Sequence, residues 1–390
     1  MKYQSPPFPP PTLGILGGGQ LGRMLLAETM KWGIETHILD PDPNCSCAAL
    51  TTHFTCGDFR NYDDVLNFGR KVSVLTIEIE QVNTEALFQL EKEGIAVHPS
   101  PKSLRIIQDK GTQKKLYAEK EIPTAPFWLF DNAQNIREAY QTGILALPFV
   151  QKTRQMGYDG KGVQVLRHET DLEHLFDTPS LVEVCVDIRK EIAVIVAQSR
   201  GETAAFPPIE MVFHPTANLV EYLQCPADLP PTLYRQAIDL AADTLQAFDI
   251  QGVLAVEMFL NNNGQWLINE VAPRPHNSGH FTIEAAMVSQ YEQHLRSVLS
   301  MPLGSPALKV PASVMLNILG DTRQSGVAYY EGLSNCMALE GVYIHLYGKR
   351  QTRPFRKMGH VTILGNDIQH AIKKADFVRK NLCVIAQNEE

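Results

Sequence analysis

The stretch GVLAVEMFLNNNGQWLINEV, residues 252–271, predicts the element on which the fold depends, a β-hairpin whose two strands flank an NNNG turn. Asparagine and glycine tolerate the backbone conformations of a tight turn, and the flanking residues are mostly apolar. If NNNG is the turn, Leu260 pairs with Gln265, and Glu257 lies opposite Ile268. The hairpin therefore carries acidic side chains at defined positions in an apolar setting.

Two glutamates of this hairpin, Glu257 and Glu270, are candidate metal ligands. Side chains alternate between the faces of a strand, so the register puts both carboxylates on one face, one diagonal apart. Carboxylates this close repel each other unless a cation lies between them, and oxygen ligands suit Mg²⁺. A solvated hairpin face is the alternative, but the apolar neighbours favour the metal site. Asn269 points the other way by strict alternation, and becomes a third ligand only where the strand ends or twists.

The chain around the hairpin alternates between strands and helices. An alternating βαβ pattern over residues 12–100 predicts a parallel sheet with helices on its faces, and hence an α/β fold. The strands expected there are 12–17, 35–40, 72–80 and 95–100, with a helix near 20–32. Further along we expect one helix from Ser103 to about residue 120, short strands at 163–166, 181–184 and 191–197, a helix at 231–249, and a strand-rich C-terminal piece ending in a helix near 367–380.

Composition limits the classes of function. The chain has 390 residues, is 44% hydrophobic and carries a formal charge of −8, so a broad basic surface for nucleic acid or anionic membrane is not expected. The seven cysteines form no CxxC pair, which favours free thiols in a reducing compartment. The start, MKYQSPPFPPP, has no apolar core of a secretion signal, and no segment reaches the roughly 18 apolar residues of a membrane span. We expect a cytoplasmic protein.

A glycine-rich turn follows the first strand: GILGGGQLGRMLL, residues 14–26, contains Gly17-x-Gly19-x-x-Gly22. Asp40 ends the next strand, where dinucleotide-binding proteins place a ribose-binding acid. The motif is therefore compatible with a dinucleotide-dependent oxidoreductase. The same exposed N–H groups and helix dipole attract any anion, so the motif alone does not identify the ligand.

Lysines and glycines suited to phosphate binding occur in the middle of the chain. GYDGKG, residues 157–162, follows a strand that ends near Lys152, and Lys110 lies in QDKGTQKK. Backbone N–H groups of a glycine-rich loop approach phosphate closely, and a lysine adds charge. The spacing is not that of a P-loop, and a surface turn is the alternative.

Two later stretches suit anionic ligands. In NEVAPRPHNSGH, residues 269–280, Arg274 and His276 are flanked by prolines that stiffen the backbone. In YGKRQTRPFRKMGH, residues 347–360, five cations occur within eleven residues, which suits a phosphate clamp unless the loop is simply solvated. They are Lys349, Arg350, Arg353, Arg356 and Lys357.

Taken together, these motifs resemble the ATP-grasp ligases. Within them, GGGQLGRM, QKTRQMGYDGKG, NEVAPRPHNSGH and RKMGHVTILG resemble the 5-(carboxyamino)imidazole ribonucleotide synthetases of purine biosynthesis, and the match runs from about residue 12 to 380. The resemblance implies an ATP-dependent carbon–nitrogen ligase. Its substrates would be bicarbonate and 5-aminoimidazole ribonucleotide (AIR), and its products the N5-carboxylated nucleotide, ADP and phosphate, formed through carboxyphosphate. It also implies Mg²⁺ and a homodimer.

The resemblance also assigns residues. ATP would contact Lys110, Lys152, the loop Gly157, Tyr158, Asp159, Gly160, Lys161, Gly162 and Val163, the hinge Glu183, Val184, Cys185 and Val186, and also Glu191, His214, Asn269 and Glu270. Mg²⁺ would bind Glu257 and Glu270, with Asn269 nearby. AIR would contact Gln20, Leu21, Glu78, Tyr158, Asp159, Arg274, His276 and Asn277, with its phosphate on Lys349 and Arg356. Lys152, Arg274 and Asp159 would act in catalysis, Asp159 as acceptor of the amine proton. Lys110 stands where the family usually has arginine, which keeps the charge but not the fork of donors.

The resemblance implies four parts: a tail (1–11), a Rossmann-like pre-ATP-grasp domain (12–108), an ATP-grasp domain (109–303, with lobes 109–186 and 187–303) and a C-terminal domain (304–390). Three alternatives remain. Formate-dependent glycinamide ribonucleotide transformylase has the same layout, although YDGKG and RPHNSGH favour the carboxylating enzyme. An oxidoreductase leaves the hairpin glutamates and the basic cluster unexplained. A non-catalytic ATP-binding protein should have lost Glu257 or Glu270.

Overall fold

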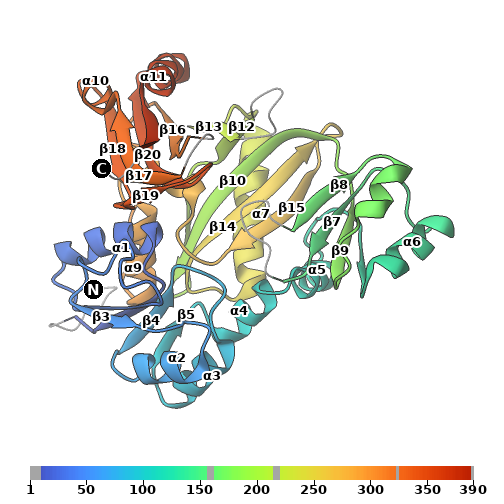
Figure 1. Ribbon diagram of the computed structural model, residues 1–390, viewed down its shortest axis with the longest axis horizontal. Helices are drawn as coiled ribbons and strands as arrows, with labels where there is room; N and C mark the ends of the chain where they lie inside the picture. The colour runs from blue at the N-terminus through green and yellow to red at the C-terminus, as the bar shows by residue number, and fades with distance from the viewer. Residues whose placement is uncertain (1–9, 156–161, 214–219, 322–324, 388–390) are drawn as a thin grey trace.

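A computed structural model describes residues 10–155, 162–213, 220–321 and 325–387 (Figure 1). Its N-terminal part is a parallel sheet, as the sequence predicted, in the order β3-β2-β1-β4-β5, in which β3 was not among the expected strands. Helices α1 and α9 cover one face, and α2 and α3 cover the other, so the central strands are buried on both sides. The elements are β1 (Leu13–Leu16), β2 (Thr36–Asp40), β3 (His53–Cys56), β4 (Val74–Ile77), β5 (Ala96–His98), α1 (Gln20–Lys31), α2 (Tyr62–Gly69), α3 (Thr84–Lys92) and α9 (Gln290–Val298).

The expected single helix from Ser103 to residue 120 is wrong, because two helices occupy this segment: α4 (Pro101–Ile107) and α5 (Lys110–Glu119). Asp109 between them is extended and caps α5, because its side chain accepts a hydrogen bond from the N–H of Thr112. Arg154 holds the same carboxylate at 2.8 Å. The break makes Lys110 the first residue of α5.

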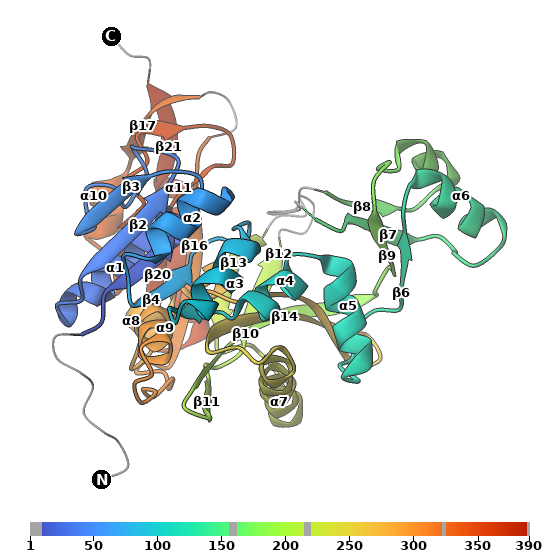
Figure 2. The same ribbon diagram turned by 90° about the horizontal axis from the view of Figure 1, so that it is seen from below.

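The small lobe is an antiparallel sheet in the order β6-β9-β7-β8, covered on one face by α6. Its strands are β6 (Phe127–Phe130), β7 (Phe149–Thr153), β8 (Val163–Leu166) and β9 (Ser180–Val184), and α6 is Ala133–Gln141. The face away from α6 carries Lys152 beside Val163, and Glu183 beside Val150. Figure 2 shows this lobe at one end of the molecule, with the N- and C-terminal parts together at the other end.

A nine-stranded sheet forms the centre, in the order β15-β14-β10-β12-β13-β16-β20-β18, with β11 paired to β10. Helix α7 (Pro231–Phe248) packs on β10, β14 and β15 through an apolar core. The strands are β10 (Ile188–Ser199), β11 (Glu202–Ala205), β12 (Ile209–Phe213), β13 (Val220–Cys225), β14 (Gly252–Asn261), β15 (Trp266–Ala272), β16 (Ala312–Leu319), β18 (Val342–Leu346) and β20 (Lys357–Gly365).

The strand-rich C-terminal piece continues this central sheet, because β16 pairs with β13. Its remaining elements are β17 (Gly326–Glu331), α10 (Leu333–Met337), β19 (Gln351–Thr352), α11 (Ile368–Asn381) and β21 (Cys383–Gln387), so a strand follows the helix expected near 367–380. Two short helical segments precede it, η2 (Asn277–Gly279) and α8 (Thr282–Ala285). Within the described ranges, no helix has the length and apolar character to cross a membrane.

Candidate active site

The β14–β15 hairpin brings Glu257 and Glu270 directly opposite each other. The expected register was wrong by one residue, because Leu260 pairs with Trp266 and a β-bulge follows the next pairs. The bulge makes Asn269 an extra residue in β15, so a diagonal pair of glutamates becomes a facing pair.

The bulge also settles the direction of Asn269. Ile268 and Val271 both pack in the α7 core, so the two residues between them, Asn269 and Glu270, lie away from that core. The strict alternation that would point Asn269 the other way therefore does not hold here, because the strand is interrupted by a bulge. Both side chains are available to the same face of the sheet.

A third carboxylate, Glu191, joins the pair from the neighbouring strand β10. It pairs with Phe259, and Ala193 pairs with Glu257, so Glu191 and Glu257 lie one diagonal apart on one face. We call this surface, formed by Glu191, Glu257, Asn269 and Glu270, the acidic face. Desolvation, then the charges of Glu270 and Glu191, raises the pKa of Glu257 to about 8. Burial raises the pKa of Glu191 to about 7. Carboxylates held together in this way favour a bound cation.

Two lysines contact the acidic face. Lys110 Nζ donates to Glu270 Oε2 at 3.0 Å, and Lys152 Nζ donates to Asn269 Oδ1 at 2.8 Å. Desolvation would raise the pKa of Glu270, but the two lysines outweigh it and lower this pKa to about 2. The Glu270 side chain is 47% exposed, so a ligand can reach it. The predicted phosphate lysines thus lie beside the predicted metal ligands.

A buried ion cluster connects the two lobes behind these lysines. Glu183 of β9 accepts from Lys152 at 2.7 Å and from Lys114 at 2.5 Å, and its side chain is 5% exposed. Lys114 lies on α5, and its side chain is 1% exposed. It also donates to the hydroxyl of Thr124, and this hydroxyl donates to the carbonyl of Ile268 at 2.7 Å. Sequence reasoning missed Lys114. Its spacing of four residues from Lys110 on one helix was the available signal.

The hinge after β9 has mixed surroundings. The N–H of Val184 donates to the carbonyl of Pro126 at 3.0 Å, and that of Cys185 donates to the carbonyl of Pro148 at 3.4 Å. Val184 and, on β8, Val163 and Val165 are exposed apolar side chains. The structure therefore leaves apolar surface for a planar ligand, while the carboxylate of Glu183 is occupied by lysines.

Arg274 and His276 follow β15 closely, and His276 lies beside Glu257 of the acidic face. Arg274 forms an ion pair with Glu80 at 2.8 Å, and His276 Nε2 lies 3.7 Å from Glu257 Oε1. Asn277 donates to Asn317 at 3.1 Å. Sequence reasoning missed Glu80, although it stands two residues after Glu78 on the same segment.

The glycine-rich turn holds carboxylates of the chain itself. The N–H of Gly18 donates to Asp40 at 2.7 Å, and those of Gly19 and Gly22 donate to Glu78 at 2.5 and 2.6 Å. A Cβ on Gly19 would lie 2.6 Å from the Glu78 carboxylate, so glycine is required for this approach. Gln20 and Leu21 begin α1 directly after the turn. Asp40, the expected ribose ligand of a dinucleotide site, is therefore engaged with the turn.

The basic cluster lies partly beside α1. Lys349 donates to the carbonyl of Lys357 at 2.7 Å, and Arg356 donates to that of Gln351 at 2.6 Å. Desolvation and the charge of Arg353 lower the pKa of Arg356. A Cβ on Gly348 would lie 3.1 Å from the guanidinium of Arg23, so a further cation adjoins the cluster. An anion is the expected partner for so many cations.

Some predicted site residues fall outside the described ranges. They are Gly157, Tyr158, Asp159, Gly160, Lys161 and His214. Gly162 is described and has φ of +73°, a conformation that favours glycine.

Comparisons with known proteins give consistent results. Residues 11–108 match the ribonucleotide synthetase preATP-grasp domain, 115–291 the ATP-grasp domain, and 313–374 the phosphoribosylaminoimidazole carboxylase C-terminal domain. The predicted ATP-grasp fold is thereby confirmed. A chloroplastic phosphoribosylaminoimidazole carboxylase of Vigna aconitifolia is 36% identical over 97% of this chain, which spans 67% of that relative's length.

Solved structures are similar over nearly the whole chain. N5-carboxyaminoimidazole ribonucleotide synthetase from Thermotoga maritima has a TM-score of 0.87 and 36% identity, covering 97% of this chain and 100% of its own. An Aspergillus clavatus N5-carboxyaminoimidazole synthase, crystallised with ADP and AIR, has a TM-score of 0.86 and 30% identity, covering 95% and 98%.

Proposed function

The chain belongs to the N5-carboxyaminoimidazole ribonucleotide synthetase family of ATP-grasp ligases, and on this premise we propose that it carboxylates AIR. The reaction consumes ATP and bicarbonate and yields the N5-carboxylated nucleotide, ADP and phosphate. The observation that carries the proposal is the acidic face, where Glu257 faces Glu270, and lysines from two different elements contact Glu270 and Asn269.

ATP would lie between the small lobe and the acidic face. The exposed valines Val163 and Val165 offer apolar contact for adenine, and the hinge Glu183, Val184, Cys185 and Val186 supplies backbone groups. Glu191 would meet the ribose. Lys110 and Lys152 would meet the phosphates, together with the loop of Gly157, Tyr158, Asp159, Gly160, Lys161 and Gly162, and His214 would line the same site. Each lysine would exchange an internal carboxylate or amide partner for a phosphate oxygen.

The donor set of the acidic face fits Mg²⁺. Glu257, Glu270 and Asn269 offer hard oxygen ligands. Desolvation, then the charges of Glu270 and Glu191, raises the pKa of Glu257, and a divalent cation would favour its ionised form. When bound, the ion would offset the negative charge that develops during phosphoryl transfer.

AIR would lie toward Arg274 and the basic cluster. Arg274, His276 and Asn277 would hold the substrate beside the acidic face, and Lys349 and Arg356 would bind its 5′-phosphate. Gln20, Leu21 and Glu78 would complete this side, together with Tyr158 and Asp159.

The chemistry has two steps. A bicarbonate oxygen attacks the γ-phosphorus, the bond to the ADP oxygen breaks, and carboxyphosphate forms while Lys152 stabilises the transferring group. Carboxyphosphate then releases CO₂ and phosphate, the exocyclic amine of AIR attacks CO₂, and a carboxylate accepts the amine proton. Asp159 is the acceptor in this proposal, with Arg274 holding the anionic group.

Magnesium as the metal, a homodimer and a cytoplasmic location belong to the same proposal. None of the seven cysteines, all of which lie in the described ranges, forms a disulfide, which favours a reducing compartment. Light scattering of the purified chain tests the homodimer.

Substrate pairs test the activity. ADP release by the purified chain is measured with ATP and Mg²⁺, comparing AIR plus bicarbonate with glycinamide ribonucleotide plus formate. The proposal expects release only with the first pair. Release with the second pair would instead support the transformylase, and release with neither would contradict both.

A further inference from the structure

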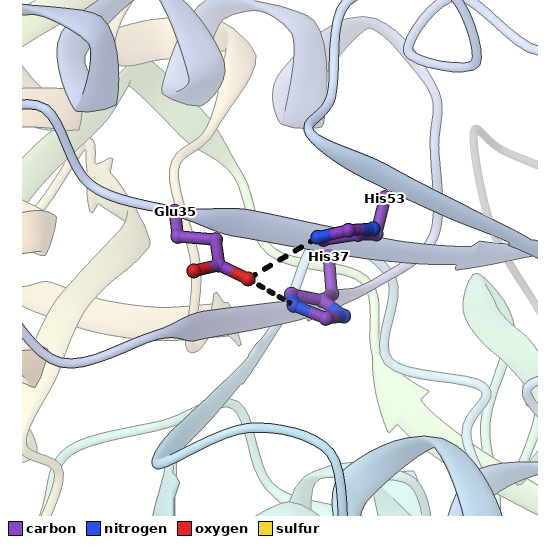
Figure 3. Close-up of side chains that lie close together, drawn as sticks. All are labelled: Glu35, His37 and His53. Atoms are coloured by element: carbon purple, nitrogen blue, oxygen red, sulfur yellow. Dashed lines mark hydrogen bonds and ion pairs between the residues drawn. The ribbon is translucent and has the colours of Figure 1, made fainter.

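Three potential metal ligands converge on the edge of the N-terminal sheet, in a different sheet from the acidic face. Figure 3 shows the carboxylate of Glu35 pointing at the rings of His37 and His53. Glu35 Oε1 lies 3.1 Å from His37 Nε2 and 3.2 Å from His53 Nε2. Neither phosphate binding nor AIR binding uses these residues.

The sheet itself produces this arrangement. His37 of β2 and His53 of β3 are register partners, and Glu35 precedes His37 by two residues, so the three side chains share one face. Glu35 and His37 stand at positions i and i+2 of one segment, and His53 stands on the neighbouring strand, so all three can bind the same ion. The centroids of the two imidazole rings lie 4.4 Å apart, with the ring planes tilted by 36°.

Neighbouring hydrogen bonds fix the segment that carries His53. Thr51 Oγ1 donates to the carbonyl of Thr36 at 2.9 Å, and the N–H of Thr36 donates to Thr52 Oγ1 at 3.3 Å. These contacts hold the start of β3 against β2. The ligands are therefore positioned before any ion arrives, which lowers the ordering cost of binding.

The spacing of the donor atoms fits a transition metal. Ligand bonds of about 2.0–2.1 Å in tetrahedral geometry put neighbouring donor atoms about 3.3 Å apart. The two nitrogen–oxygen separations are within a few tenths of an ångström of that value. Two imidazoles and one carboxylate suit Zn²⁺ and disfavour Mg²⁺ or Ca²⁺, which prefer oxygen ligands.

We propose that Glu35, His37 and His53 form a Zn²⁺ site with three protein ligands and a fourth position for water. Coordination places the ring proton of each histidine on Nδ1, so that Nε2 presents its lone pair to the ion. The side chains of Glu35 and His53 are 48% and 55% exposed, and that of His37 is 11% exposed, so an ion has access from solvent. The bound ion would cross-link the edge strand β3 to the segment before β2.

Calorimetric titration with ZnCl₂ tests the site. The full chain is first treated with a chelator, and the Glu270→Gln background is used so that the acidic face does not contribute. One equivalent of Zn²⁺ should bind, and His53→Asn or Glu35→Gln should weaken its affinity at least about tenfold, as loss of metal-site groups typically does. His174→Asn, which changes an exposed histidine elsewhere, is the matched control.

A spectroscopic readout distinguishes coordination from loose binding. Co²⁺ in a four-coordinate site with imidazole ligands gives strong visible absorption, whereas hydrated Co²⁺ does not. The band should appear in the wild-type chain and in His174→Asn, and should disappear in His53→Asn. An equal zinc affinity in His53→Asn and in the control, or no visible band in the wild-type chain, would show that the three residues form only a hydrogen-bonded cluster.

Discussion

Glu257 of β14 and Glu270 of β15 face each other. Removing the charge of either carboxylate therefore weakens the binding of a cation between them. We expect Glu270→Gln to lower kcat for ADP formation roughly 100- to 1000-fold, the range for losing one preorganised electrostatic group. AIR binding, measured by calorimetry, should remain nearly intact because its proposed contacts lie elsewhere. Near-normal turnover in this variant would contradict the metal assignment.

The basic cluster makes a second prediction for single residues. Lys349 and Arg356 would each give the AIR phosphate charge-assisted hydrogen bonds worth roughly 1.5–3 kcal/mol. Lys349→Ala or Arg356→Ala should therefore raise the KM for AIR roughly 10- to 150-fold. The KM for ATP should hardly change. Steady-state kinetics with each substrate varied separately measures the two KM values. If the variants mainly raise the KM for ATP, Lys349 and Arg356 do not bind the AIR phosphate.

Sequence reasoning identified the charged residues of the acidic face but not their exact relation. Glu257 and Glu270 were placed on one face because period-two alternation is a local property. The role of Asn269 depends on a bulge, which arises where Ile268 and Val271 both enter the α7 core. Such a packing compromise between distant elements has no local signature.

Helix α5 carries the ion cluster that joins the lobes. Lys114 is buried against Glu183, and removing its charge would leave that carboxylate with Lys152 alone. We expect Lys114→Met to draw Lys152 away from Asn269 and lower kcat by about tenfold or more, with little effect on the KM for AIR. The exposed neighbour Lys115→Met is the matched control. Equal kinetics in the two variants would show that the cluster does not position Lys152.

Elements with strong local patterns were predicted, and long-range pairings were not. Helix α7 and the parallel strands other than β3 follow from periodicity and flanking proline or glycine. The break before α5 depends on the cap at Asp109, which competes with helix continuation. The pairing of β13 with β16 joins segments far apart in sequence, so the shared central sheet could not be derived from local patterning.

Buried histidines couple the stability of the whole molecule to pH. His294 accepts from the N–H of Val253 at 3.3 Å and lies 2.9 Å from Thr76 Oγ1, and burial lowers its pKa to about 3. The unfolded chain, with a histidine pKa near 6.5, binds the proton first on acidification. The stabilisation is thus fully present above about pH 6.5 and is lost toward pH 3, by about 1.4 kcal/mol per pH unit.

Denaturant unfolding across this pH range checks the contribution of His294. In His294→Asn the free energy of unfolding should fall less steeply between pH 6 and 4 than in the wild-type chain. The difference in slope should approach about 1.4 kcal/mol per pH unit. Parallel pH curves for the two proteins would contradict a neutral buried His294.

Ligand binding gives a second prediction for the whole molecule. An ATP analogue with Mg²⁺ should raise the melting temperature, because a ligand that binds only the folded state stabilises it by mass action. NAD and FAD should leave it unchanged, because N–H groups of the glycine turn already hold Asp40 and Glu78. A clear shift with a dinucleotide at sub-millimolar concentration would restore the oxidoreductase interpretation.

Oxygen transfer tests the central claim most directly. The purified chain is supplied with AIR, ATP, Mg²⁺ and bicarbonate labelled with ¹⁸O, and the phosphate released is analysed by mass spectrometry before the label exchanges with water. Attack of bicarbonate on the γ-phosphorus predicts one labelled oxygen in each phosphate, because the bridging oxygen of carboxyphosphate stays with phosphorus when CO₂ leaves. Phosphate released at the same rate without label would mean that water attacks ATP, and would contradict the proposed carboxylation through carboxyphosphate.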